Sequence, residues 1–206
     1  MLLAPWQTNA GLIVLYTAFL VHGLLGFYAL YRRRHLRMPA SEAWQLALGL
    51  TIPFLLLSHP IGIRLGEFQY SHELGYAPIL NKFWIVSPDF ALPRQLLLLL
   101  VLWVHGCIGL RAWLRTKRAY YRLTGALASL ATLVPVLAIL GVVNAGLNLR
   151  EAVLRDPVYA ASLGPAPDSK EATQNTASVV RIADGMAVSY LGLVIVVFGL
   201  RAQLAR

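Results

Sequence analysis

The stretch Leu123–Leu149 reads LTGALASLATLVPVLAILGVVNAGLNL and contains no charged residue over 27 positions. A helix needs about 20 apolar residues to cross the hydrocarbon core of a bilayer, so this stretch is long enough to span a membrane. It predicts a span over 123–147, and four further blocks with few or no charges predict spans over 11–31, 43–63, 95–114 and 182–200. The sequence therefore predicts an all-α integral membrane protein, a five-helix transmembrane bundle that forms a single membrane domain over 1–206.

The composition agrees with a membrane protein and excludes several other classes. Of the 206 residues, 58% are hydrophobic and only 13% are charged, about half the charged share of soluble proteins. Disorder is excluded, and an ordinary soluble domain is disfavoured. One cysteine, Cys107, rules out an internal disulfide and any multi-cysteine zinc or iron–sulfur site within the chain.

The net charge of +9 is explained by topology rather than by nucleic-acid binding. The segments after the first, third and fifth spans hold 11 basic residues and one acid, Glu42, whereas the opposite side holds 7 basic residues and 8 acids. Basic residues collect on the cytoplasmic side of membrane proteins. We therefore expect the N-terminus outside and the C-terminus in the cytoplasm.

The two outer loops differ in composition. Residues 64–94 are rich in aromatic side chains and are expected to form a folded cap over the bundle. Residues 150–181 contain the run Gly164-Pro165-Ala166-Pro167-Asp168-Ser169, which predicts a flexible loop with a short helix before it.

An internal repeat relates the first two spans to the third and fourth. Residues 21–32 (VHGLLGFYALYR) align without gaps on residues 104–115 (VHGCIGLRAWLR), and six of the twelve positions are identical. Pro53 of the second span and Pro135 of the fourth also correspond, at an offset of 82 instead of 83. Internal repeats of this kind are common in membrane folds.

The repeat places two histidines at the same depth. His22 and His105 each lie 10 residues before an arginine at the inner boundary, roughly 15 Å along a helix and so near the bilayer midplane. Two histidines on separate helices can ligate one iron from opposite sides, which predicts a b-type haem. Four glycines near the imidazoles would clear room for a flat macrocycle: Gly23, Gly26, Gly106 and Gly109. The alternative is that each histidine hydrogen-bonds a serine or a carbonyl within the bundle.

Further polar residues lie near the membrane edge. His59 is five residues before Arg64, and a second haem would use His59 with His72 of the cap. A quinone would bind near His59 and the cap. Arg64 and Arg111 either pair with haem propionates or anchor helix ends among lipid headgroups.

Three segments carry a resemblance to a known family: residues 45–53 (QLALGLTIP), 58–64 (SHPIGIR) and 103–115 (WVHGCIGLRAWLR). They resemble the cytochrome b-type membrane anchor of bacterial class III adenylate cyclases, and less closely the cytochrome b subunits of succinate dehydrogenase and fumarate reductase. The likeness covers roughly residues 10–150 and the fifth span only by position. It implies a multi-pass protein of the bacterial inner membrane, followed by a cytoplasmic ferredoxin-like module and a cyclase, and a homodimer. Diheme members use histidines on four helices, whereas this chain supplies three.

Three functions follow from the sequence as hypotheses. The first is a haem b anchor that senses a redox or quinone signal and passes it to a cytoplasmic effector, an adenylate cyclase, attached after the last span. This chain alone holds no cyclase residues and would not be an enzyme. The second is a cytochrome b subunit that transfers electrons between a quinone and a soluble flavoprotein or iron–sulfur partner. The third is a metal-free receptor or structural anchor.

Overall fold

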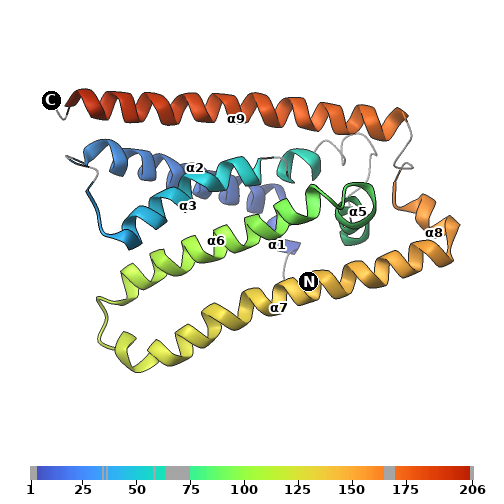
Figure 1. Ribbon diagram of the computed structural model, residues 1–206, viewed down its shortest axis with the longest axis horizontal. Coiled ribbons are helices and arrows are strands. Elements are labelled where there is room, and N and C mark those ends of the chain that lie inside the picture. Colours follow the sequence, from blue (N-terminus) through green and yellow to red (C-terminus); the bar gives the residue numbers. More distant parts are fainter. Residues whose placement is uncertain are drawn as a thin grey trace. The chain divides into compact units, whose positions relative to one another are not determined.

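The computed structural model describes residues 4–33, 35, 37–57, 59–63, 75–164 and 170–204, and in this part of the chain every regular element is a helix (Figure 1). The long helices are α2 (Asn9–Arg32), α3 (Ala40–Leu56), α6 (Ala91–Leu114), α7 (Tyr120–Arg155) and α9 (Lys170–Leu204). The short ones are α1 (Ala4–Gln7), α5 (Tyr76–Asn81), the π-helix η1 (Lys82–Val86) and α8 (Pro157–Ser162).

Five helices are long and apolar enough to cross a membrane, as the sequence predicts. They cover Asn9–Arg32, Ala40–Ile63, Ala91–Leu114, Tyr120–Arg155 and Ala177–Gln203. Most of their large apolar side chains are exposed, among them Ile13, Leu137 and Val188. A soluble protein would bury such side chains, so the surface suits a lipid environment. The fold is therefore that of a multi-pass all-α membrane protein.

Each of these five stretches is longer than the uncharged block predicted for it, because charged residues at a membrane edge continue the helix. The difference is largest over 150–181, where a flexible loop was expected. There α7 runs on to Arg155, α8 follows, and α9 begins at Lys170. The side chain of Asp156 starts α8 by accepting hydrogen bonds from the backbone N–H groups of Val158 and Tyr159, at 2.9 and 3.0 Å.

The chain divides into two compact units. The first comprises Met1–Met38 and Val188–Arg206. Within it, Phe27 of α2 meets Tyr190 of α9 edge to face, with ring centroids 5.9 Å apart. Arg201 is buried, and its Nε donates a hydrogen bond of 3.2 Å to the backbone carbonyl of Arg33, the residue that ends α2. A cation at this position stabilises the negative end of the helix dipole.

The second unit, Pro39–Ala187, contains α3, α6 and α7. Helices α3 and α6 pack along each other, and they are antiparallel because Gln45 contacts His105 whereas Phe54, further along α3, contacts Arg94. A short turn then reverses the chain into α7 (Figure 1). Trp103 of α6 donates a hydrogen bond of 2.8 Å from Nε1 to the carbonyl of Ala131 in α7.

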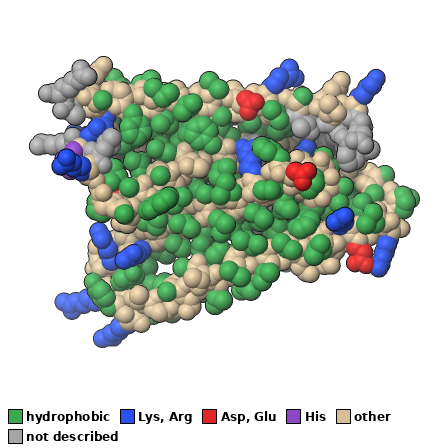
Figure 2. Space-filling model, viewed as in Figure 1, with side chains coloured by type: hydrophobic (Ala, Val, Ile, Leu, Met, Phe, Trp, Pro, Cys, Tyr) green, Lys and Arg blue, Asp and Glu red, His purple; other side chains and the backbone are tan. Residues whose placement is uncertain are grey.

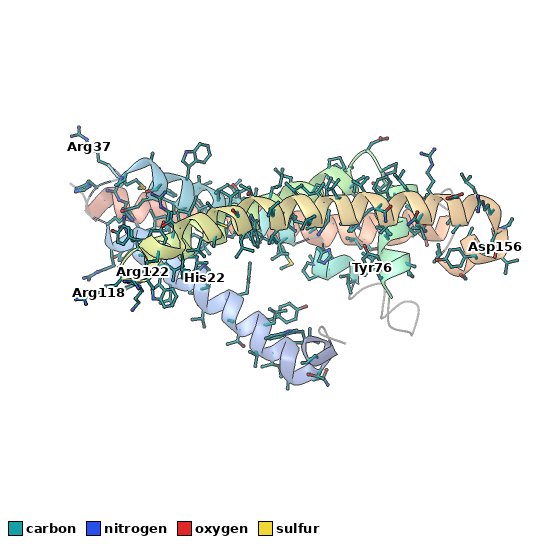
Figure 3. The ribbon with its side chains drawn as sticks, turned by 90° about the horizontal axis from the view of Figure 1, so that it is seen from below. His22, Arg37, Tyr76, Arg118, Arg122 and Asp156 are labelled. Atoms are coloured by element: carbon teal, nitrogen blue, oxygen red, sulfur yellow. The ribbon has the colours of Figure 1, made fainter. Side chains whose placement is uncertain are left out.

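The surface of α6 and α7 shows the charge pattern expected of membrane spans. Hydrophobic side chains cover the visible face along both helices, and Lys and Arg gather at the end where they join (Figure 2). Arg118 and Arg122 lie at this end of α7, and Asp156 follows its other end (Figure 3). Basic residues therefore predominate at the end where α6 and α7 join, whereas basic and acidic residues are mixed at the other end of α7.

The described part of the expected cap packs on the Asp156 end of α7. Leu80 of α5, Leu149 of α7 and Leu163 after α8 form a small buried cluster. The indole of Trp84 in η1 lies directly on Gly146 of α7, where any Cβ would overlap it. A glycine is therefore required at this contact. The remaining residues of the cap, 64–74, lie outside the described residues.

Candidate functional site

His105 lies on the side of α6 that packs against α3, and both of its ring nitrogens contact Gln45. Nδ1 is 3.1 Å from the backbone carbonyl of Gln45, and Nε2 is 3.3 Å from the side-chain Nε2 of the same residue. A carbonyl only accepts hydrogen bonds, so Nδ1 carries the proton and Nε2 holds the lone pair. These contacts hold the imidazole in one orientation and, in its neutral form, select the tautomer with the proton on Nδ1.

Glycine makes this close approach possible. A Cβ at Gly49 would lie 2.9 Å from Cε1 of His105 and 3.4 Å from Nδ1, so a larger residue in this turn of α3 would push the ring away. Gly109, one turn beyond His105 on α6, faces Gln45, and a Cβ there would lie 3.1 Å from the amide nitrogen. The sequence predicts that the space at Gly109, beside His105, holds a macrocycle. In the structure this space holds the Gln45 carboxamide.

The Gln45 carboxamide is only partly satisfied. Its Oε1 is buried and has no hydrogen-bond partner among the described residues. Buried polar atoms are nearly always bonded, because an unpaired one costs about 1–3 kcal/mol. Sequence reasoning missed Gln45 and Gly49 as site residues, although their spacing of four places them on one face of α3.

His22 lies in the other unit, on an exposed face of α2. A Cβ at Gly23 or Gly26 would meet no atom within 4 Å, and the same holds for Gly106 beside His105. These three glycines therefore leave open space beside the histidines. The pairing of His22 with His105 on one iron stays a prediction, since the two residues belong to different units.

A second polar group lies nearer the other end of α3. Residues 59–63 are helical and His59 is half-buried. Arg94 of α6 donates a hydrogen bond of 2.7 Å from Nη2 to the carbonyl of Phe54. The guanidinium also lies 5.8 Å from the centroid of the Phe90 ring and interacts electrostatically with Asp184. Sequence reasoning assigned Arg94 no role beyond ending the outer segment 64–94.

The remaining predicted site residues lie apart from these contacts or outside the described residues. Arg111 is exposed on α6, which suits a headgroup anchor as well as a propionate partner. Cys107 is a half-buried free thiol. His72 and Arg64, assigned to a second haem and to a propionate, lie outside the described residues.

The cap contains a lysine in an apolar setting. Burial lowers the pKa of Lys82 below its ordinary value of 10.5, because the charged ammonium loses contact with water. Close by in the sequence, the buried Nε1 of Trp84 has no partner among the described residues. The cap thus buries polar groups as well as apolar ones.

Among the described residues, no three His, Cys, Asp or Glu side chains lie close enough to hold a metal ion. A bis-histidine haem needs only two protein ligands. Comparisons with protein-family models, curated proteins and solved structures found no match, so the function is inferred from the residues themselves.

Proposed function

We propose that this chain is a haem b-binding membrane anchor of the bacterial inner membrane, with His22 and His105 as the axial ligands of the iron. The anchor senses a redox or quinone signal and regulates a cytoplasmic effector attached after the last span, which the sequence resemblance suggests is an adenylate cyclase. When bound, the haem supplies a one-electron redox centre within the membrane.

The orientation of His105 is the observation that carries this proposal. Histidines that ligate a metal usually donate their other ring N–H to a backbone carbonyl or a carboxylate, which fixes the ring and the tautomer. The contact of 3.1 Å from Nδ1 to the Gln45 carbonyl is of this kind. This contact leaves the lone pair on Nε2 of His105. The partner of Nε2 is the Gln45 side chain, which can rotate, and not a fixed backbone group. The Nδ1 contact is therefore of the kind that an axial ligand makes, while Nε2 is bonded to the Gln45 carboxamide.

The test is the absorption spectrum of the full chain, purified after expression with added haem precursor. We expect a Soret band and, on reduction, the sharp bands of a six-coordinate b-type haem. His22→Ala and His105→Ala should each lose the six-coordinate spectrum. His35→Ala is the matched control, because His35 is exposed and contacts the carbonyl of Arg37 in its own loop. A colourless protein, or a His105→Ala variant with unchanged spectrum, contradicts the proposal.

One observation favours the metal-free alternative as a second candidate. Both ring nitrogens of His105 already have partners in Gln45, which is what a histidine with a purely structural role requires. In that case His105→Ala lowers stability and no variant or addition of haem gives a Soret band. The same spectra therefore separate the two candidates.

A further inference from the structure

We propose that Gln45 has two opposed effects on the proposed haem ligand His105: its backbone carbonyl holds the ring in the ligating tautomer, while its carboxamide competes with iron for Nε2. This inference rests on the proposed haem function. It adds that the Gln45 side chain regulates how tightly haem binds.

The first step is the assignment of the protons. The Gln45 backbone oxygen accepts from Nδ1–H of His105 over 3.1 Å, so in the neutral ring Nε2 is an acceptor. The side-chain Nε2 of Gln45 lies 3.3 Å from that acceptor and donates to it. With the amide turned over, Oε1 would face the same lone pair and two acceptors would meet. The lone pair that would bind iron is therefore already engaged by the protein.

The second step is that this competitor can be removed. The Gln45 carboxamide gains one hydrogen bond at His105, while its buried Oε1 has no partner among the described residues. It rests beside Gly109, where a side chain would crowd it. Turning the amide away breaks one hydrogen bond at Nε2, while Oε1 has no hydrogen bond among the described residues to lose. The bond from Nδ1 to the backbone carbonyl does not depend on the side chain, so the ring keeps its orientation.

The experiment is a titration of the haem-free full chain in detergent with hemin, followed by the Soret absorbance of the specific complex and corrected with His105→Ala for non-specific uptake. Gln45→Leu and Gln45→Ala remove the competing amide and keep the backbone carbonyl. Loss of one net hydrogen bond should tighten hemin binding about fivefold. Gln95→Leu is the matched control, because it removes a half-buried glutamine from α6 that has no described contact with His105.

The outcomes separate this inference from the proposed function. Specific binding that is unchanged or weaker in both Gln45 variants, with Gln95→Leu like the native chain, overturns the role of Gln45 and leaves the haem function standing. Absence of specific binding in every protein overturns both.

A second measurement is made on the native chain and uses a variant only to assign one signal. In the haem-free native chain labelled with ¹⁵N-histidine, the His105 ring, assigned by its loss in His105→Ala, should show a protonated Nδ1 and an unprotonated Nε2 that accepts a hydrogen bond. A protonated Nε2 overturns the inference, because the lone pair would then not face Gln45.

Discussion

At the scale of single residues, the ring of His105 lies against α3 at Gly49. The hydrogen bonds between His105 and Gln45 can form only if α3 and α6 lie close together, with the imidazole ring in contact with α3. Gly49 allows this, since a Cβ there would be 2.9 Å from Cε1 of the ring. Small residues at close helix contacts are common in membrane bundles for the same reason. The glycine on α3 thus decides where the histidine on α6 can sit.

We expect Gly49→Ala to destabilise the haem-free chain by roughly 1–2 kcal/mol. Overpacking a tight contact costs about 1–3 kcal/mol, and the better helix propensity of alanine returns up to about 1 kcal/mol. Thermal unfolding in detergent measures the change. Gly141→Ala in α7 is the control, because a Cβ there meets nothing within 4 Å, and it should be neutral or slightly stabilising. Equal stability of the two variants would show that the contact at Gly49 is not tight.

The sequence predicts His105 as a site residue but not its partner. A histidine at mid-membrane is conspicuous because ionisable side chains are rare there. Gln45 and Gly49 are 60 and 56 positions away from it, and nothing in a span that is apolar on all sides indicates which face packs inward. The contact therefore had to come from the structure.

At the scale of elements, Arg94 connects α6 to the end of α3. The guanidinium of Arg94 supplies a donor to the carbonyl of Phe54 at 2.7 Å, just before α3 ends at Leu56. We interpret Arg94 as a polar link between α6 and the C-terminal part of α3.

Replacing Arg94 by Gln should destabilise the chain by about 1.5–3 kcal/mol, the range for hydrogen bonds to charged groups. Lysine should restore little of this, because its compact ammonium lacks the planar, forked donors of arginine. Thermal unfolding of both variants in detergent is the measurement, with Arg122→Gln on the exposed end of α7 as the control. A stable Arg94→Gln variant would mean that the Phe54 carbonyl finds another donor or needs none.

The helices themselves were largely predictable, because absence of charge over about 20 residues is a strong signal that needs no knowledge of packing. The elements of the outer segments were predictable only in part. The short helix expected before the run 164–169 is α8, which Asp156 and Pro157 begin. The six-residue helix α5 has no side-chain cap and depends on its contacts with α7. The residues after the run were expected to belong to the flexible loop, whereas α9 begins at Lys170.

At the scale of the whole molecule, the charges set the orientation in the membrane. Arg118 and Asp156 flank opposite ends of α7 (Figure 3), so in a membrane they would face opposite sides. The excess of basic residues on the Arg118 side predicts that this side is cytoplasmic.

Cysteine labelling tests this orientation. In a Cys107→Ser background, Asp156→Cys should react with a membrane-impermeant maleimide on intact cells, because Asp156 is exposed and expected outside. Arg118→Cys, also exposed, should react only after permeabilisation. The reverse pattern would invert the orientation and place the C-terminus outside, where no cytoplasmic effector could be attached.

The contact between Trp84 and Gly146 affects how the length of α7 matches the thickness of the bilayer. The uncharged stretch of α7 has 27 residues, roughly 40 Å of helix, whereas the hydrocarbon core is about 30 Å thick. Such a hydrophobic mismatch would force the helix to tilt or the lipid to thicken around it. The cap packs on Ala145, Gly146 and Leu149 and so covers one face of the last turns with protein, while Leu147 stays exposed. Residues 123–144 alone span roughly 33 Å, close to the core of an ordinary bilayer, so on the face under the cap no lipid has to cover the remaining turns.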